Sequence, residues 1–248
     1  AQDAVENALR QIVPTDAPGV TIEPRVVPGP EGAPDVPIIL YRPVDAKGRL
    51  PVLLHVHGFN TSYDEARFRL AQISTDTGFG GVPVLFTWAS KSELLAYGSD
   101  KESATVARDP LQRLLLEIAA TPGVGRVHIL AHSMGTWLTM ETLRELVIAG
   151  KPDLDGKLGN VMLAAPDIDL SVFRQQISRL DPSHVSVFVS KGDRALSLSR
   201  TLAGDRPRLG AMNPNDPKDS EALSRLGVKV YDLSALSSGF IGHGTYAR

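Results

Sequence analysis

Six short runs of aliphatic residues recur along the chain from residue 50 onward, separated by longer segments with helical periodicity. The runs are apolar nearly throughout, whereas a strand with one face in water alternates apolar and polar residues. The predicted strands cover residues 52–56, 82–88, 127–131, 161–165, 185–190 and 228–233. Strands of this kind are covered on both faces, which predicts a parallel sheet packed between helices.

The segments between these runs carry helix start signals. Ser62 and Glu65 form an S-x-x-E capping box. Asp109 before Pro110 is typical of an N-cap followed by the first helical position, and Asp169 is placed to cap another helix. A strand-helix-strand series with right-handed crossovers predicts the α/β class, as a three-layer α/β/α sandwich around a mostly parallel sheet.

The first 50 residues differ in texture from the rest. Pro and Gly crowd residues 14–37, around two candidate strands at 20–26 and 36–41. These strands would extend the sheet as an antiparallel edge and bring it to about eight strands. Residues 1–12 fit a short amphipathic helix, and residues 203–220 fit a long surface loop.

The charge balance and the residue counts exclude several classes of function. With 26 basic and 28 acidic side chains the formal net charge is -2, which offers no basic field to a phosphate backbone, so we expect no nucleic-acid partner. The absence of cysteine excludes disulfides, thiolate metal sites and a cysteine nucleophile. No apolar run approaches the roughly 20 residues of a membrane span, so we expect a soluble protein. Ala1 in place of Met fits a processed exported protein or a trimmed cytoplasmic one, and the compartment and oligomeric state stay open.

The strongest local motif is the pentapeptide Ala-His-Ser-Met-Gly at residues 131–135, between a predicted buried strand and a predicted amphipathic helix. Small residues two positions before and after Ser133 permit a strained strand-to-helix turn that presents its hydroxyl, as in a nucleophile elbow. A helix that starts at Ser133 also directs backbone N–H groups toward developing negative charge. The alternative is that Ser133 only caps a helix. The flanking strand and helix favour a nucleophile.

A nucleophilic serine needs a base, and the base needs a carboxylate to orient it. In this architecture both come from the carboxyl ends of later strands, in the chain order Ser, acid, His. His184 precedes a strand and falls at the opposite end of the sheet, so His243 is the predicted base, against the alternative of a solvated loop histidine. Asp193 follows a strand about midway between Ser133 and His243 and is the predicted acid. Asp167, one strand earlier, is the alternative, although its position also suits the start of a helix.

The oxyanion of a tetrahedral intermediate needs two donors. One is the backbone N–H of Met134, the residue after the nucleophile. The other is expected after the first core strand, where Gly58 permits a sharp turn and the N–H of Phe59 can point inward. We expect His57 to brace this loop in preference to acting as a base. The residues expected to line the substrate site are His57, Gly58, Asn60 and His132.

These residues resemble those of the α/β-hydrolase superfamily, specifically its serine esterases and lipases. Residues 57–243 are similar to a bacterial α/β-hydrolase family of unknown function. The motifs that carry this resemblance are His-Gly-Phe-Asn at 57–60, Phe-Thr-Trp at 86–88, Leu-Ala-His-Ser-Met-Gly at 130–135, Ala-Ala-Pro-Asp at 164–167 and Gly-His at 242–243. The resemblance implies Ser133 as nucleophile, Asp193 as acid and His243 as base.

Residues 1–57 are similar to a different group, the opening of hormone-sensitive-lipase-like esterases. Those enzymes continue with His-Gly-Gly-Gly, whereas this chain reads His-Gly-Phe-Asn at residues 57–60. A fused or chimeric chain is therefore one hypothesis. A second departure is Ala131, which replaces the usual glycine of the elbow but fits it sterically.

The expected function is hydrolysis of carboxylic esters, with short acyl chains, through an acyl-enzyme and a Ser-His-Asp triad. Only one helix fits between the strands at 161–165 and 185–190, so we expect no large cap domain and an open acyl site. No metal or organic cofactor is expected. We expect a single α/β-hydrolase domain over residues 1–248, with edge strands in 1–50 and the catalytic core in 51–248. The alternative is a catalytically silent α/β-hydrolase scaffold that acts as a binding module.

Overall fold

The computed structural model describes residues 20–27, 36–44, 48–91, 96–191 and 206–235, together with Asp193, Ala195, Leu196 and Ser199. The chain divides into two units, Ala1–Leu50 and Pro51–Arg248. The helix expected at residues 1–12 lies outside the described residues.

The first unit contains an antiparallel hairpin of β1 (Val20–Val27) and β2 (Val36–Pro43), with Val27 opposite Val36 and Val20 opposite Pro43. The expectation that these strands extend the main sheet to eight is wrong, because they pair with each other in a two-stranded sheet of their own. Neighbouring strands joined by a short connection lose little loop entropy when they pair, which favours this local solution.

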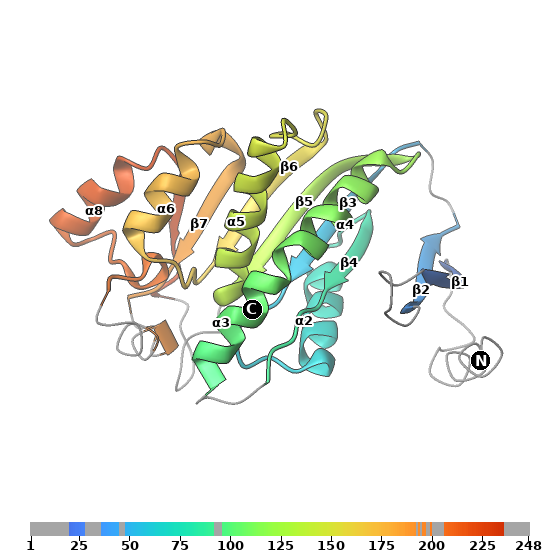
Figure 1. Cartoon of the computed structure of the whole chain (residues 1–248), viewed down its shortest axis with the longest axis horizontal. Helices are drawn as coiled ribbons and strands as arrows, with labels where there is room; N and C mark the ends of the chain where they lie inside the picture. Colours follow the sequence, from blue (N-terminus) through green and yellow to red (C-terminus); the bar gives the residue numbers. More distant parts are fainter. Residues whose placement is uncertain are drawn as a thin grey trace. The chain divides into compact units, whose positions relative to one another are not determined.

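The second unit is built on a six-stranded sheet with the order β4-β3-β5-β6-β7-β8 (Figure 1). The pairs β3–β4, β5–β6, β6–β7 and β7–β8 are parallel, as the unbroken apolar runs predicted. The strands are β3 (Leu50–Val56), β4 (Val82–Phe86), β5 (Val124–His132), β6 (Leu158–Ala164), β7 (Val185–Val189) and β8 (Lys229–Asp232).

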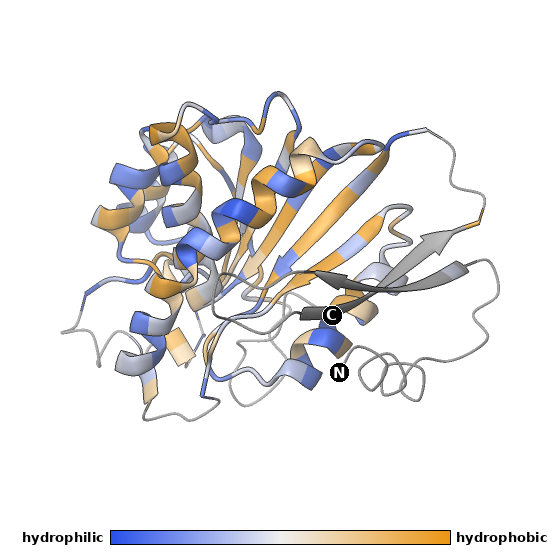
Figure 2. Cartoon of the chain, turned by 45° about the vertical axis from the view of Figure 1, so that its right-hand side comes forward, coloured by the Kyte–Doolittle hydropathy of each residue, from blue (hydrophilic) through white to orange (hydrophobic). Residues whose placement is uncertain are grey.

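Helices cover both faces of this sheet, and the side chains of the strands separate into two apolar clusters. One cluster joins Leu54 of β3 to Leu115 of α4 (Arg108–Ala120) and Leu143 of α5 (Met134–Ile148). The other joins Leu53, the adjacent residue of β3, to Leu70 of α2 (Tyr63–Asp76). Because successive strand residues point to opposite faces, the two clusters are the two interfaces of a three-layer α/β/α sandwich, which confirms the predicted fold class. In Figure 2 the strands are largely orange, while the helices carry both hydrophobic and hydrophilic residues.

The α-helices whose bounds the structure describes in this unit are α2 (Tyr63–Asp76), α3 (Tyr97–Val106), α4 (Arg108–Ala120), α5 (Met134–Ile148), α6 (Leu170–Ile177) and α8 (Pro217–Ser224). Two predicted caps are confirmed: Ser62 Oγ accepts a first-turn N–H of α2 (3.2 Å), and Asp169 Oδ1 accepts two first-turn N–H groups of α6. The prediction that Asp109 caps a helix is wrong. Ala107 ends α3 and begins α4 at once, so α4 already starts at Arg108.

The loop expected at residues 203–220 also contains regular structure. A 3-10 turn covers Leu209–Ala211, and α8 begins at Pro217. Asp216 Oδ1 accepts the N–H groups of Lys218 (2.9 Å) and Asp219 (3.2 Å). The Asp-Pro pair therefore acts as a helix start, although it also fits a turn.

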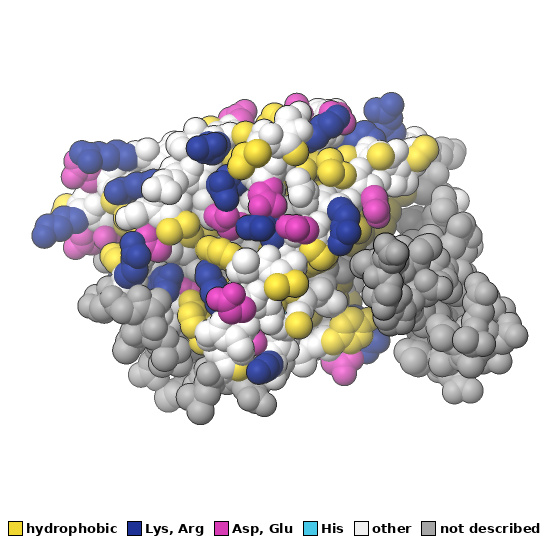
Figure 3. Space-filling model, in the orientation of Figure 1, with side chains coloured by type: hydrophobic (Ala, Val, Ile, Leu, Met, Phe, Trp, Pro, Cys, Tyr) yellow, Lys and Arg dark blue, Asp and Glu magenta, His cyan; other side chains and the backbone are white. Residues whose placement is uncertain are grey.

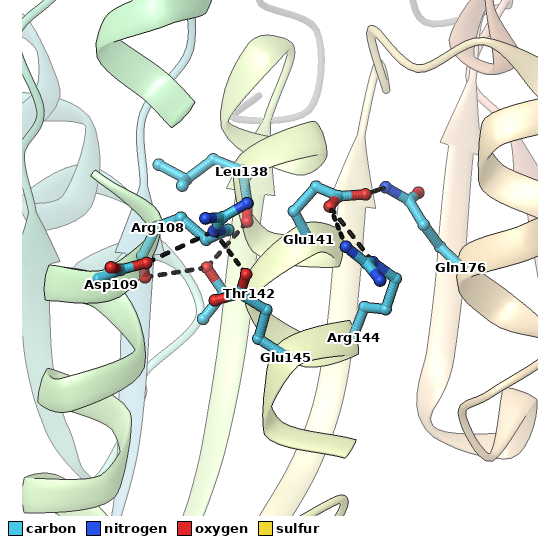
Figure 4. Close-up of polar contacts among 8 residues, drawn as sticks. All are labelled: Arg108, Asp109, Leu138, Glu141, Thr142, Arg144, Glu145 and Gln176. Atoms are coloured by element: carbon cyan, nitrogen blue, oxygen red, sulfur yellow. Dashed lines mark hydrogen bonds and ion pairs between the residues drawn. The ribbon is translucent and has the colours of Figure 1, made fainter. Parts of the chain in front are cut away.

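Ion pairs join side chains on the outer surface of the helix layer. Arg108 Nε of α4 lies 2.7 Å from Glu145 Oε1 of α5, and Glu141 of α5 accepts hydrogen bonds from Arg144 (3.2 Å) and from Gln176 of α6 (2.7 Å) (Figure 4). Figure 3 shows side chains of both charge signs intermixed on this face. Within the described part of the chain, no helix combines the length and the apolar character that crossing a bilayer requires.

Candidate active site

Ser133 occupies the turn between β5 and α5, where its backbone has φ 51° and ψ -124°. A positive φ is strained for a residue with a Cβ and persists only where the surroundings hold it. The Ser133 carbonyl accepts hydrogen bonds from Thr136 N (3.0 Å) and Thr136 Oγ1 (2.6 Å), and its N–H donates to Ala164 O of β6 (3.0 Å). The serine side chain makes no capping hydrogen bond to α5. Helix capping therefore does not account for this residue.

Two glycines let the turn after β3 lie directly on this elbow. A Cβ at Gly58 would lie 2.7 Å from Ser133 Cβ, and a Cβ at Gly135 would overlap His57 O. Neither glycine has a positive φ, so close approach and not backbone torsion requires the missing side chain. The loop that carries Phe59 is thus packed against Ser133.

His57 is held on all sides by this loop and by the end of β4. Its Nε2 accepts a hydrogen bond from Trp88 N (3.2 Å), so Nδ1 carries the proton and donates to Gly58 O (2.9 Å). Trp88 Nε1 donates to His57 O (2.9 Å), and the two rings stack with centroids 5.2 Å apart. Burial lowers the pKa of His57 below its usual value. Both ring nitrogens are therefore engaged in bracing contacts of a neutral imidazole.

The two predicted oxyanion residues flank Ser133 from different elements. Met134 is fully buried as the first residue of α5. Phe59 lies in the loop after β3, and its ring meets that of Tyr97 edge-on at 5.4 Å. The next residue, Asn60, has φ 54° and donates its N–H to Ser90 Oγ (3.1 Å), which fastens the loop to the segment after β4.

Two further histidines lie at this end of the sheet. His132 is 8% exposed and its ring packs against Gly58, where an added Cβ would come within 2.9 Å of Nδ1. His55 of β3 is 1% exposed, and its Nδ1 lies 3.0 Å from Leu130 O of β5. Burial lowers the pKa of His55 to about 4, so this histidine is a neutral part of the core at neutral pH.

Both candidate acids are buried beyond the carboxyl end of a strand. Asp193 follows β7, and its Oδ1 accepts a hydrogen bond from Leu196 N (3.0 Å). Asp167 follows β6 and lies beside the elbow, since its N–H donates to Ser133 O (3.3 Å). Position alone does not separate the two carboxylates.

The carboxylate of Asp167 is already engaged by three side chains. Its Oδ2 accepts a hydrogen bond from Tyr97 OH (2.9 Å), and its Oδ1 accepts one from Ser199 Oγ (2.5 Å). Arg208 Nε lies 3.3 Å from Oδ1 as an ion pair, with the arginine only 7% exposed. Asp169, two residues later, has the structural role of capping α6 and pairs with Arg206 (3.0 Å).

His243 lies outside the described residues, and the triad of Ser133, Asp193 and His243 therefore stays a prediction. Among the residues that the structure describes, no group of three or more His, Asp and Glu side chains could hold a metal ion.

For three side chains around the site, the sequence predicts no role. Trp88 ends the Phe-Thr-Trp motif at residues 86–88, but its contact to His57 spans 31 residues. Tyr97 and Arg208 meet Asp167 from separations of 70 and 41 positions. Contacts between such distant positions leave no local pattern, so only the fold reveals them.

Comparison with known proteins agrees with this architecture. Residues 40–248 match the family described as an alpha/beta hydrolase of unknown function (DUF900). Among solved structures, the bacterial brefeldin A esterase, a homologue of human hormone-sensitive lipase, is 16% identical over 93% of this chain and 74% of its own, with a TM-score of 0.52. A fungal esterase structure from Rhizomucor miehei is 13% identical over 98% of this chain and 82% of its own, with a TM-score of 0.51. No curated protein matches the sequence.

Identities this low establish the shared fold alone, whereas the family match covers most of the chain. The resemblance to α/β-hydrolases stated from the motifs is confirmed. The chain belongs to the α/β-hydrolase family of unknown function DUF900.

Proposed function

We propose that this protein is a serine hydrolase that cleaves carboxylic esters with short acyl chains through an acyl-enzyme. The observation that carries the proposal is the backbone of Ser133, with φ 51° in the turn from β5 to α5 and the Phe59 loop packed onto it. Strain of this kind costs on the order of 1–3 kcal/mol and is typical of functional sites. The esterases that share the fold support an ester as the substrate class.

In the proposed first half-reaction, Ser133 Oγ attacks the carbonyl carbon of the ester and transfers its proton to His243. Asp193 orients the imidazole and stabilises the imidazolium without taking its proton. The C=O bond becomes a C–O⁻ single bond, and the N–H groups of Met134 and Phe59 donate hydrogen bonds to this oxyanion. Collapse of the intermediate breaks the ester C–O bond, and His243 returns the proton to the departing alcohol.

The second half-reaction repeats these steps with water as the nucleophile. His243 takes a proton from water, and the hydroxide adds to the acyl-enzyme carbonyl. The acyl C–Oγ bond then breaks to release the carboxylic acid, and His243 returns its proton to Ser133 Oγ. All groups in this scheme belong to the protein, and the scheme requires no cofactor.

The contacts of Asp167 favour a structural role for its carboxylate, which leaves Asp193, after β7, as the acid of this scheme. Asp167 has its oxygens engaged by Tyr97, Ser199 and Arg208. An orienting acid has the different task of accepting the imidazole N–H. A carboxylate that already balances a buried arginine suits a structural task better than this one.

The acyl preference follows from the connection between β6 and β7. Residues 165–184 contain α6 and one short 3-10 turn, Pro182–His184, with no room for a cap domain. An open site without a long apolar tunnel gains little from additional methylenes, each of which changes binding by about 1–3 kcal/mol only where a pocket encloses it.

The experiment is a panel of p-nitrophenyl esters with acyl lengths from C2 to C16, assayed with the parent and with Ser133→Ala. We expect the highest kcat/KM at C2 to C4 and a loss of roughly 10⁴-fold or more in kcat for the variant. Equal rates for the two proteins would refute the assignment. A parent without turnover on any ester would support the silent binding scaffold instead.

A further inference from the structure

Separate segments of the chain converge on the buried carboxylate of Asp167. The backbone of this residue is hydrogen-bonded to Ser133, the proposed nucleophile. We propose that Asp167 is a positioning residue, which acts through Tyr97 to hold the Phe59 loop over Ser133. This inference rests on the proposed function and extends it, because it assigns a role to a carboxylate outside the triad.

The backbone of Asp167 is fixed to the elbow and to the neighbouring strand end. Its N–H donates to Ser133 O (3.3 Å), and the carbonyl of the preceding Pro166 accepts a hydrogen bond from Gly210 N (2.9 Å). Gly210 in turn accepts from Ser190 N at the end of β7 (2.8 Å). The backbone that carries this carboxylate is therefore fixed relative to Ser133.

Tyr97 links this carboxylate to the oxyanion loop. Its hydroxyl donates to Asp167 Oδ2 (2.9 Å), and its ring supports the ring of Phe59 edge-on at 5.4 Å. The contacts thus form a closed circuit of residues, in which Ser133 contacts Asp167, Asp167 contacts Tyr97, and Tyr97 contacts Phe59. Gly58, which precedes Phe59, closes the circuit, because a Cβ there would lie 2.7 Å from Ser133 Cβ.

The opposite carboxylate oxygen holds the segment that follows β7. Ser199 Oγ donates to Asp167 Oδ1 (2.5 Å), and this segment also carries Asp193. One buried anion thus fastens the proposed oxyanion loop on one side and the segment of the proposed acid on the other.

Two cations interact electrostatically with this carboxylate. Arg208 Nε forms the ion pair with Asp167 at 3.3 Å. The second cation is Lys101 of α3, whose charge interacts with that of Asp167 and whose Nζ lies 3.6 Å from the Trp137 ring centroid. Burial raises the pKa of Tyr97 to about 12, with the charge of Asp167 adding to the effect, so Tyr97 stays a hydrogen-bond donor. Burial lowers the pKa of Lys101 to about 8, which Asp167 partly opposes.

The test compares Asp167→Asn and Tyr97→Phe with two references. Asp193→Asn measures the loss of a triad acid, roughly 10⁴-fold in kcat. Asp169→Asn is the matched control, since it makes the same change in a buried carboxylate two residues away that caps α6. We expect kcat to fall about 10- to 100-fold in Asp167→Asn and about 5- to 10-fold in Tyr97→Phe, with KM within about threefold of the parent, because the misplaced donor serves the transition state. Asp169→Asn should keep the parent kcat.

The double variant shows whether the two residues act as one unit. Tyr97→Phe should cost little more in the Asp167→Asn background, because the single amide oxygen is held by Ser199 and Arg208 and the amide NH2 gives the Tyr97 hydroxyl no acceptor. Independent, multiplicative losses would overturn the proposed circuit. A kcat of Asp167→Asn equal to that of the parent would overturn it too, as would an Asp167→Asn loss near 10⁴-fold beside a nearly unaffected Asp193→Asn, which would make Asp167 the triad acid.

Hydrogen exchange at the Asn60 amide, which follows Phe59 and donates to Ser90 Oγ (3.1 Å), is a second readout that needs no turnover. We expect exchange at least about tenfold faster in Tyr97→Phe and Asp167→Asn than in Asp169→Asn. Should the parent hydrolyse no ester, the proposed function fails while this measurement still decides the positioning role. Should Asp167→Asn not fold, Tyr97→Phe decides alone, and unchanged exchange in it would overturn the inference.

Discussion

Two pairs of glycines at opposite ends of the main sheet serve different purposes. At the amino ends, Gly123 and Gly150 lie in turns with φ 82° and 75°, and a Cβ there would meet no atom within 4 Å. At the carboxyl ends, Gly58 and Gly135 lack a positive φ, but a Cβ would collide with the neighbouring segment. Positive φ at this end falls instead on residues that carry a side chain, namely Ser133, Asn60 and Ala165.

The difference reflects the separate structural roles of these two pairs of glycines. Gly123 and Gly150 serve backbone torsion, as glycines of ordinary helix-to-strand connections do. Gly58 and Gly135 instead permit the contact of two backbone segments at one strained serine. A close contact that also fixes a strained, functional side chain is expected to tolerate substitution far less than a turn with open space around it.

The most damaging change at this contact should be Gly135→Ala. The new Cβ would overlap His57 O and lie 2.7 Å from Val56 O, so either α5 or the end of β3 must move. We expect a loss of about 3 kcal/mol or more in the free energy of unfolding and of at least about 100-fold in kcat. Urea denaturation and the ester assay measure the two losses. Parent-like stability and kcat would show that the contact is not a constraint.

Acidification should destabilise the carboxyl-end core through His55. Its folded pKa is about 4, below the ordinary 6.5, so between these values the unfolded chain binds a proton that the folded chain does not. Stability is therefore present above pH 6.5 and is lost as the pH falls toward 4. Between pH 7 and 5 the loss from this group is about 2 kcal/mol.

The control for this effect is His55→Gln, which removes the titrating group but keeps a donor for Leu130 O. Urea titrations of both proteins at pH 7 and pH 5 should show a clearly smaller loss in the variant. An equal loss in the two proteins would mean that His55 does not carry the pH dependence. His57, whose pKa is also lowered by burial, leaves some acid sensitivity in both.

Trp88→Phe tests the brace on the Phe59 loop more gently. The change keeps an aromatic ring against His57 but removes the Nε1–H that donates to His57 O. A buried carbonyl without its partner costs about 1–2 kcal/mol, and we expect a three- to tenfold loss in kcat from a less ordered Phe59. Stability curves together with kcat and KM provide the check. A stability loss with an unaltered kcat would separate the brace from the site.

Gly150→Ala is the counterpart at the amino end and should have the smallest effect. Its φ of 75° makes alanine unfavourable by about 1 kcal/mol, but no atom obstructs the methyl group. The ester assay should give the parent kcat. A kcat loss as large as that of Gly135→Ala would erase the contrast between the two ends.

Much of the fold could be predicted from local sequence. The six core strands follow from their unbroken apolar runs, and the caps of Ser62 and Asp169 follow from side chains that bond within their own first turn. The strand and helix around Ser133 are equally local, because small residues at fixed offsets permit the turn.

The wrong predictions have a common cause. In each case the local sequence is compatible with two structures, and it does not show which of them is more stable in the folded protein. The segments around Asp109 and Pro217 each fit two structures, and tertiary context chose α4 from Arg108 and α8 from Pro217. The strands β1 and β2 pair with each other in preference to extending the main sheet. The contacts of Asp167 with Tyr97 and Arg208 come from distant segments, so the site could be predicted at its nucleophile but not in its supporting network.

The central claim, that the strained turn holds an activated nucleophile, is tested most directly by reaction with a fluorophosphonate followed by peptide mapping. Attack by Ser133 on phosphorus displaces fluoride and leaves a stable phosphonyl ester on its Oγ. We predict a single adduct on the peptide that contains residue 133, formed in the parent and absent in Ser133→Ala. No adduct in the folded parent, or the same labelling in both proteins, would contradict the account.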